Sequence, residues 1–242
     1  MSDYFNITPR PPQGRDLGKY VGIEIECLTG SWDDLARRFD KAGVKNTIIK
    51  DDGSVEGEGE PTEVCVLSTI NDLSNLKKVM ESLNDAVATV NTSCGLHIHL
   101  DMRHVTKTRA KQIARRMAKA LPVLRKTVAP YRNVSEYCEA NLSNGDRYAA
   151  INTECYDKYG TIEIRLHQGT LDFIKIRNWI MLLYKLSRAA KLSTRPSLEK
   201  LSKEAKLGTR LTKYYEQRIA AFDFLKKLEP SEVVVDVYQD SW

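Results

Sequence analysis

The chain has 242 residues, 42% of them hydrophobic, and a formal charge of +5, which suits one compact domain, or one and a half, with a substantial core. No apolar run approaches the length of a membrane span, and residues 1–18 lack the apolar segment of a signal peptide, so we expect a cytoplasmic protein with no membrane partner. The five cysteines are odd in number and show no CxxC spacing, which argues against a disulfide framework and against a zinc knuckle.

Strands and helices alternate along the N-terminal half. Ser31 and Gly43 are good capping residues for the first helix, and Asp51–Ser54 is typical of a turn that leads into an acidic loop. The predicted elements are an extended arm (1–18), a strand (19–28), a helix (33–41), a short strand (46–50), a strand (62–67), a helix (73–90) capped by Ser68 or Asn71, and a strand (94–101).

The C-terminal half begins with a helix rich in Lys and Arg, which Pro122 should kink or restart. The mixture of helices with strands that pair mostly antiparallel predicts an α+β fold. The predicted elements are the basic helix (106–121), a long loop (130–146), two strands (147–153 and 160–168), a long helix (173–192) that begins after Asp172, two amphipathic helices (198–206 and 209–228), and a tail whose apolar run 233–238 could pair as an edge strand.

The positive charge of the chain is concentrated in one segment. Eight Lys or Arg and no acid lie between residues 107 and 126, so the remainder of the chain carries 5 − 8 = −3. Such a helix can attract nucleic acid or an acidic partner, and it can equally be a solvated helix face, which is the commoner case. The segment 107–126 is therefore a candidate docking surface that also has a simpler structural explanation.

Three of the predicted strands alternate apolar and polar side chains. Because successive side chains of a strand point to opposite faces, each strand has one face for the core and one polar face. If the three strands share a sheet, their polar faces form one wall of carboxylate, imidazole and guanidinium groups turned toward solvent. The polar sets are Glu24 and Glu26, then His97, His99 and Asp101, then Glu163, Arg165 and His167.

This wall carries the donors of a metal site. Glu24 and Glu26 should lie about 6 to 7 Å apart on one strand face, which suits two adjacent Mg²⁺ or Mn²⁺ ions. His97 and Glu163 could complete the two sites, and Arg165 could neutralise charge on a transferring phosphoryl group. Each motif alone also fits a structural role, such as a solvated strand face or a cross-strand ion pair, so the hypothesis depends on the three occurring together.

Six short motifs follow one another along the chain: VGIEIE (21–26), DDGS (51–54), PTEV (61–64), SCGLHIHLD (93–101), RYAAIN (147–152) and TIEIR (161–165). In this order they resemble the amidoligase family, which belongs to the glutamine synthetase-like carboxylate-amine ligases, and the resemblance covers residues 19–192. It implies a largely antiparallel curved sheet of glutamine synthetase-like catalytic type with helices packed on its outer face. The catalytic domain would span residues 19–193, and residues 194–242 would form a C-terminal helical extension and tail.

The resemblance also implies a reaction. A substrate carboxylate would attack the γ-phosphate of ATP to give an acyl phosphate, and an amine acceptor would capture it to form an amide or isopeptide bond, with Mg²⁺ or Mn²⁺ as cofactor. The implied metal ligands are Glu24, Glu26, Glu63, His97 and Glu163; His99 and Arg165 would bind the nucleotide; Arg147, Glu163 and Arg165 would be the catalytic residues.

The chain departs from the family after Glu63, where a strand continues in place of a turn with proline, so Glu56, Glu58 and Glu60 are rivals for its role. A homo-oligomer is left open, because glutamine synthetase itself forms its sites between subunits. Three other interpretations stay open: a metal-dependent amide hydrolase of amidohydrolase type, since His-x-His-x-Asp also resembles that family; a nucleic-acid-binding protein that uses the basic helix; and a non-catalytic relative that binds peptide or scaffolds a complex.

Overall fold

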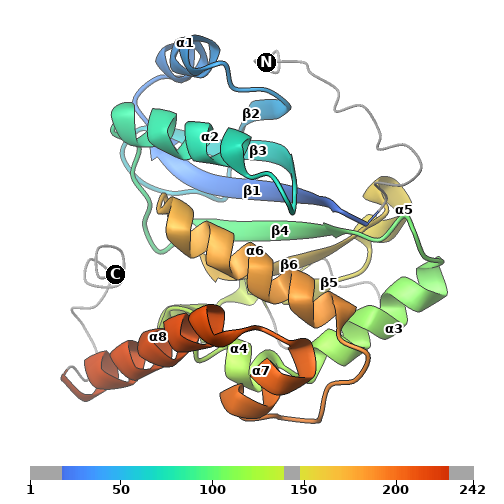
Figure 1. Ribbon diagram of the computed structural model, residues 1–242. Helices are drawn as coiled ribbons and strands as arrows, with labels where there is room; N and C mark the ends of the chain where they lie inside the picture. The colour runs from blue at the N-terminus through green and yellow to red at the C-terminus, as the bar shows by residue number, and fades with distance from the viewer. Residues whose placement is uncertain (1–17, 139–147, 229–242) are drawn as a thin grey trace.

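The structure is a computed structural model that describes residues 18–138 and 148–228 (Figure 1). Most of the predicted arm (1–18), the apolar tail run (233–238) and Arg147 lie outside the described residues. Within them, no helix combines the length and the apolar character that crossing a membrane requires.

Six strands of the described chain form one antiparallel sheet in the order β2-β3-β1-β4-β6-β5. Helices from all parts of the chain pack around this sheet, which confirms the α+β class. The strands are β1 (Tyr20–Thr29), β2 (Thr47–Asp51), β3 (Glu60–Thr69), β4 (Gly95–Asp101), β5 (Ile151–Asn152) and β6 (Thr161–Gln168).

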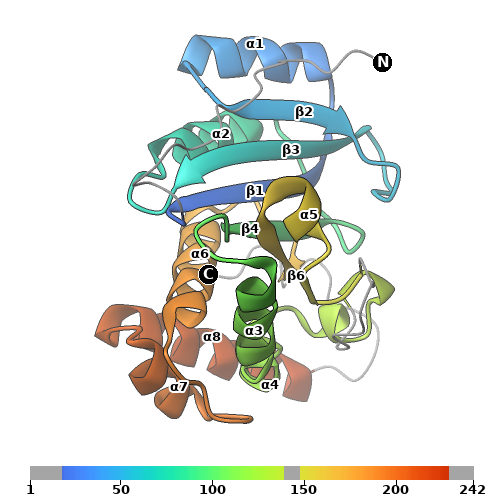
Figure 2. The same cartoon turned by 90° about the vertical axis from the view of Figure 1, so that its right-hand side faces the viewer.

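Helices α2 and α6 cross the front of the sheet in Figure 1, and their apolar residues share one buried cluster with the apolar face of β1 and β4. Helix α5 lies near β1 and β4 on the side turned to the viewer in Figure 2. The helices are α1 (Trp32–Ala42), α2 (Ser74–Asp85), α3 (Lys107–Ala118), α4 (Leu121–Leu124), α5 (Cys155–Tyr159), α6 (Phe173–Arg188), α7 (Leu198–Ala205) and α8 (Thr209–Leu228), with short 3-10 helices η2 (Pro130–Asn133) and η3 (Glu136–Cys138).

Local sequence explains where several helices begin and end. The Ser31 side chain accepts a hydrogen bond from the backbone N–H of Asp34, and Gly43 ends α1 in the left-handed conformation at φ 63°, both as predicted. Asp172 caps α6 by accepting from the first free backbone N–H groups. Pro122 lies in the first turn of α4, so the basic helix restarts there.

The helix predicted over 73–90 is confirmed at its start but wrong at its C-terminal end and in its cap. Helix α2 stops at Asp85, and Val87, which lies within the predicted range, is 80% exposed with φ at 55°. This left-handed backbone breaks the helical path before the chain enters β4. The N-cap residue is Leu73, which makes no side-chain hydrogen bond, so the predicted caps Ser68 and Asn71 are wrong. Asp72 instead accepts a hydrogen bond from the N–H of Ser74.

The C-terminal half differs from the prediction at two further points. In the described chain the strand predicted over 147–153 is reduced to β5, and α5, which no sequence pattern indicated, fills the connection from β5 to β6. Helix α6 ends at Arg188, whereas the prediction ran to 192. The described part of the predicted loop 130–146 contains η2 and η3.

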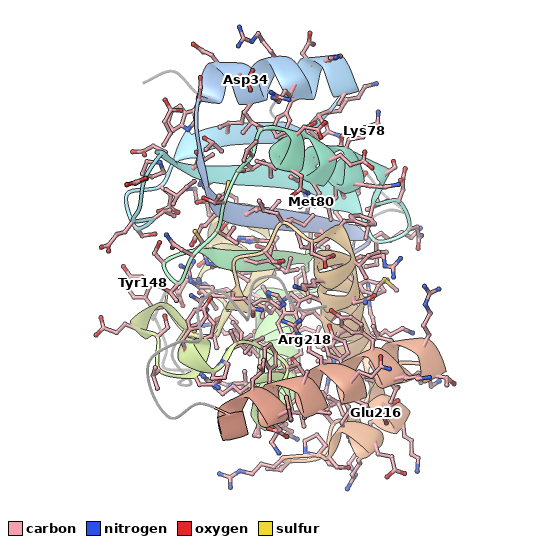
Figure 3. All side chains as sticks on the ribbon, turned by 90° about the vertical axis from the view of Figure 1, so that its left-hand side faces the viewer. Asp34, Lys78, Met80, Tyr148, Glu216 and Arg218 are labelled. Carbon is pink, nitrogen blue, oxygen red and sulfur yellow. The ribbon has the colours of Figure 1, made fainter. Side chains whose placement is uncertain are left out.

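The C-terminal helices join the main core. Leu201 of α7 and Tyr215 of α8 are buried in the cluster that also holds the apolar side chains of the sheet. Figure 3 shows Arg218 pointing from α8 into the molecule, where its Nε donates to the carbonyl of Thr127 at 2.5 Å, while Glu216 points outward. The predicted amphipathic helices therefore stabilise the domain by burying their inner faces.

Only some of the basic side chains of α3 make contacts within the protein. Lys107 forms an ion pair with Asp157 of α5, and Arg116 donates to the carbonyl of Ser187 at 2.8 Å. Arg115 and Lys119 are exposed. Binding of nucleic acid or an acidic partner at 107–126 stays a prediction.

Candidate functional site

The three strands with polar faces lie side by side, as predicted, because β4 pairs with β1 on one edge and with β6 on the other. The register sets Glu24 opposite His97, and His99 opposite Glu163. These side chains line a pocket with a volume of about 610 Å³. Residues from distant parts of the sequence therefore meet in one hollow.

His167 does not share this polar face, so its predicted place is wrong. Between Ile98 and Leu96 the strand β4 advances by two residues, while its partner β6 advances by three, from Ile164 to His167. The extra residue forms a bulge and turns His167 to the apolar side, where its ring lies 5.1 Å from that of Trp179. His167 is fully buried there, and burial keeps its pKa well below the usual range.

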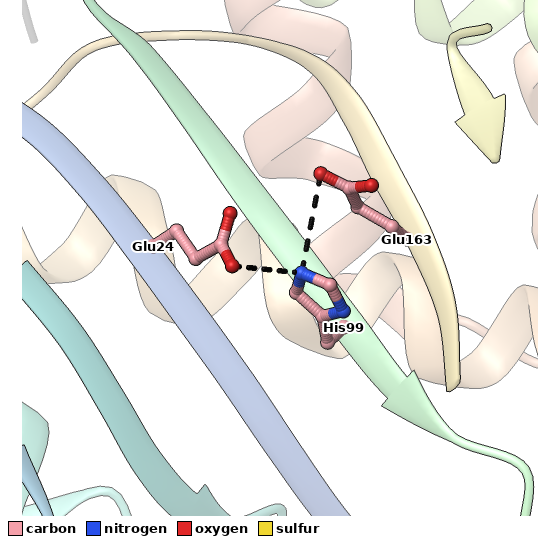
Figure 4. Close-up of side chains that lie close together, drawn as sticks. All are labelled: Glu24, His99 and Glu163. Carbon is pink, nitrogen blue, oxygen red and sulfur yellow. Dashed lines mark ion pairs between the residues drawn. The ribbon is translucent and has the colours of Figure 1, made fainter. Parts of the chain in front are cut away.

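Glu24, His99 and Glu163 form one compact group of possible metal ligands, shown in Figure 4. Nε2 of His99 lies 3.1 Å from Oε1 of Glu24 and 3.9 Å from Oε1 of Glu163. Its Nδ1 lies 3.0 Å from the hydroxyl of Thr161. When the Nδ1 proton is donated to Thr161, the lone pair of Nε2 faces two carboxylates. A cation between them would remove the repulsion between these electron-rich groups.

The Nε2 atom of His99 gives a direct test of this fit. His99 is 8% exposed, and among the described residues no group makes a well-aligned hydrogen bond with its Nε2. A buried ring nitrogen normally has a partner, since leaving it without one is costly. The imidazole and two carboxylates are also a donor set that Mn²⁺ accepts. The residues present therefore fit a divalent metal.

His97 contacts both carboxylates of β1. Its Nδ1 lies 3.2 Å from Oε2 of Glu24, and its Nε2 lies 3.2 Å from Oε1 of Glu26. Glu26 in turn accepts a hydrogen bond of 2.6 Å from the backbone N–H of Gly95. His97 thus sits between two carboxylates, and the structure groups His99 with the candidate metal ligands. Which histidine binds metal and which contacts nucleotide stays a prediction.

Gly95 matters because this part of the site is closely packed. A Cβ added to Gly95 would lie 2.9 Å from Nε2 of His97 and 3.2 Å from Oε2 of Glu26. Any larger residue at position 95 would therefore displace the imidazole of His97. The glycine leaves room for the ring while its N–H orients Glu26.

Glu163 is held by three donors at the centre of the pocket wall. Arg165 donates to its Oε1 at 2.6 Å, while Asn152 at 2.8 Å and Cys155 at 3.2 Å donate to its Oε2. Burial alone would raise the pKa of Glu163, but His99 and Arg165 outweigh it and lower the pKa below its usual value. Glu163 is therefore fixed and ionised. Sequence reasoning missed Asn152 and Cys155, which follow from the pairing of β5 with β6 and from α5.

Glu63 is the acid of the 56–63 region that lines the pocket. Lys50 donates to its Oε1 at 2.8 Å, and the thiol of Cys65 donates to the same oxygen at 2.9 Å. Its rivals, Glu56, Glu58 and Glu60, are all exposed and lie outside the pocket lining. Burial and the negative charge of Glu24 raise the pKa of Glu63. A role for Glu63 as a metal ligand stays a prediction.

The polar wall is buried, whereas we expected it to face open solvent. Glu163 is only 3% exposed, and α5 lies over this side of the sheet and supplies Cys155, Lys158 and Tyr159 to the pocket lining. Arg147, the remaining predicted site residue, is outside the described residues. The pocket is thus more enclosed than a strand face in water, which strengthens each electrostatic interaction inside it.

We expect the affinity of the pocket for Mn²⁺ to fall as the pH is lowered from about 8 to about 6. Although burial alone would lower the pKa of His99, the carboxylates of Glu24 and Glu163 raise it above its usual value. Acid therefore protonates the ring, and the proton must leave before metal binds. Manganese titrations followed by electron paramagnetic resonance would measure this. His99→Asn should flatten the pH dependence, His104→Asn on the surface should not, and an affinity independent of pH contradicts the assignment.

Comparison with known families adds an independent observation. A family model described as "Putative amidoligase enzyme" matches residues 60–142 of the 242-residue chain. The matched segment contains Glu63, His97 and His99 of the pocket, while Glu24 and Glu163 lie outside it. No curated protein matched the chain. The match confirms, over residues 60–142, the resemblance to the amidoligase family that the ordered motifs predicted.

Proposed function

We propose that the protein is an ATP-dependent carboxylate-amine ligase of glutamine synthetase-like type, which forms an amide or isopeptide bond. The observation that supports this most is the pocket itself, where β1, β3, β4 and β6 each contribute a carboxylate or imidazole to one buried hollow. The family match adds support for a ligase, since it covers the strand with both histidines.

Glu24, His99 and Glu163 would hold one divalent ion, and Glu63 would contribute to a neighbouring position that shares Glu24. Mg²⁺ or Mn²⁺ held by Glu24, His99 and Glu163 would supply positive charge that stabilises the negative charge developing on the phosphate groups of ATP. The chain's own carboxylates hold fixed positions for this purpose, because His97, Arg165, Asn152 and Gly95 orient them through the contacts described above.

Positively charged side chains also lie in the pocket, beside the acids. Arg165, Lys50 and Lys158 all line the pocket, on β6, β2 and α5. A triphosphate entering an acidic pocket needs such fixed cations beside the metal ions, and Arg165 lies nearest the carboxylate at the centre. We assign Arg165 to the transferring phosphoryl group, as the family resemblance implies.

The reaction then follows in two steps. A carboxylate oxygen of the substrate attacks the γ-phosphorus of ATP, the bond to the β-phosphate oxygen breaks, and ADP leaves. The nitrogen of the amine attacks the resulting acyl phosphate at its carbonyl carbon, phosphate leaves, and the amine loses one proton. The pocket contributes by holding the reactants in line and by excluding water, which would otherwise hydrolyse the acyl phosphate.

A hydroxylamine trap tests this proposal without knowledge of the natural amine. The full chain is incubated with ATP, Mg²⁺, hydroxylamine and a panel of carboxylic acids, and we expect one class of acid to give hydroxamate and ADP in equal amounts. Binding of a non-hydrolysable ATP analogue in the presence of Mn²⁺ is measured in parallel by calorimetry. Failure to bind the analogue contradicts the proposal, as does amide hydrolysis that needs no nucleotide.

The hydrolase alternative receives less support from the histidines. An amidohydrolase site needs further histidines beside the His-x-His pair, but His104 and His167 lie outside the pocket lining. His104 lies 3.2 Å from Nη1 of Arg188, and His167 is turned into the core. The nucleic-acid alternative depends on α3 alone, and a shift assay at two salt concentrations would test it.

A further inference from the structure

We infer that Cys65 is a metal ligand, which with Glu24 and Glu63 forms a second cation position that takes a thiophilic divalent ion such as Zn²⁺ or Co²⁺ in preference to Mg²⁺. The inference rests on the proposed function only in that the pocket binds divalent metal ions. It adds a thiolate donor, and with it a choice of metal, that the family resemblance does not imply.

The strand register brings the three donors together. On β3, Glu63 and Cys65 are two residues apart and share one face, and Cys65 lies directly opposite Glu24 of β1. One ligand atom from each of Glu24, Glu63 and Cys65 can be chosen so that all three lie within 4.8 Å of one another. The ligands of a tetrahedral Zn²⁺ lie about 3.3 to 3.8 Å apart, given bonds of about 2.0 to 2.3 Å, so the three donors must draw closer on binding. Lys50, which donates to Oε1 of Glu63, must turn away to admit the ion.

A second observation points to a bound cation directly beside this position. The buried Nε2 of His99 lacks a well-aligned hydrogen-bond partner among the described residues, and it faces Oε1 of Glu24 at 3.1 Å. Glu24 is the carboxylate that belongs to both groups of candidate ligands. One carboxylate shared by two groups is the arrangement of a two-metal site, whose ions lie about 3.5 to 4 Å apart.

The two positions differ in their chemistry. The group with His99 and Glu163 offers nitrogen and oxygen donors, whereas the group with Glu63 offers two carboxylates and a thiol. A thiolate is a soft donor that favours Zn²⁺ and Co²⁺, while Mg²⁺ prefers oxygen donors and keeps its water. On binding, the Cys65 thiol releases its proton to solvent and the sulfur binds the ion. The fourth tetrahedral position stays free for water or substrate.

Cys155 provides a matched control in the same pocket. Its thiol also contacts a carboxylate of the site, Oε2 of Glu163 at 3.2 Å, and it lines the pocket wall. It belongs to neither group of candidate ligands among the described residues. A thiol that merely lies beside the acids and a thiol that binds metal can therefore be told apart by comparing Cys155 with Cys65.

The experiment titrates Co²⁺ into the full reduced chain and follows the thiolate-to-cobalt charge-transfer band in the near ultraviolet. We expect the band in the unmodified chain and in Cys155→Ser, and its loss in Cys65→Ser together with a fall in Co²⁺ affinity of at least about 10-fold. Mg²⁺ binding, measured by calorimetry, should change little in Cys65→Ser. Should Cys65→Ser not fold, X-ray absorption of the Zn²⁺-loaded Cys155→Ser chain should show one sulfur at about 2.3 Å.

A band that is absent from the unmodified chain, or that survives in Cys65→Ser, overturns the inference, and so does a zinc shell without sulfur. These results are separate from the ligase proposal. Nucleotide binding with Mn²⁺ but no cobalt–thiolate band would remove the thiolate position and leave the ligase standing. The band without any nucleotide binding would support the metal position and contradict the ligase.

Discussion

Replacing Glu163 by glutamine should lower ATP turnover by about 10²- to 10³-fold, the scale seen when one electrostatic contact to a transition state is removed. The carboxylate faces the imidazole of His99 and would hold a divalent ion, and the neutral amide is a much weaker ligand. Glutamine keeps the length of the side chain and an oxygen that can still accept from Arg165. The change therefore removes charge with little change in shape.

The control for this prediction must separate chemistry from folding. Because Glu163 is buried, alanine would remove both oxygens that accept hydrogen bonds and leave a cavity, whereas glutamine fills the same space, so glutamine is the sharper variant. Circular dichroism should show an intact fold. Glu58→Gln makes the same chemical change on an exposed acid outside the pocket and should keep full turnover. Turnover by Glu163→Gln equal to that of the unmodified chain contradicts the site.

The sequence pattern predicted the strands of the site well because alternation is a local property. A period of two in Val21–Glu26, Leu96–Asp101 and Ile162–Arg165 indicates both the strand and its polar face. Antiparallel neighbours then bring the polar faces together whatever the connections between them. The adjacency of β1, β4 and β6 was a hypothesis at that point, and the sheet order confirms it.

The site residues that the sequence pattern did not predict reach the pocket through contacts between distant segments. Asn152 reaches Glu163 only through the pairing of β5 with β6, and Lys50 meets Glu63 only through the pairing of β2 with β3. The bulge that turns His167 inward is one inserted residue, which leaves no mark in a run of alternating residues. Helix α5 is five residues long, too short for a helical period to be recognised.

The end of α2 illustrates the limit of helical spacing. Val87 fits the apolar period of the preceding helix, yet its backbone is left-handed and its side chain is exposed. The chain must leave the helix there to reach β4, and tertiary requirements override a weak local propensity. The same reasoning explains why β4 is buried on both faces. The alternation of β4 predicts that its polar face is solvated. In the structure α5, which the sequence did not indicate, lies over that face.

Replacing Trp179 by alanine should lower the free energy of unfolding by about 3 to 5 kcal/mol, the range for a large aromatic side chain in a core. Trp179 of α6 is fully buried, and its ring packs against His167 behind the strands that carry the site. Denaturant unfolding followed by circular dichroism would measure the change. A loss of this size is a large fraction of the stability of a typical domain, so the variant should also bind nucleotide poorly.

Two further variants separate the loss of volume from other effects. Among the described residues no group accepts from the indole N–H of Trp179, so Trp179→Phe removes a buried unsatisfied donor together with part of the ring and should cost much less than alanine. Phe224→Ala on α8 removes an aromatic ring that is 59% exposed and should stay within about 0.5 kcal/mol of the unmodified chain. If Trp179→Ala were as stable as Phe224→Ala, α6 would not be packed on the sheet through this ring. The strands that hold His99 and Glu163 would then need another support.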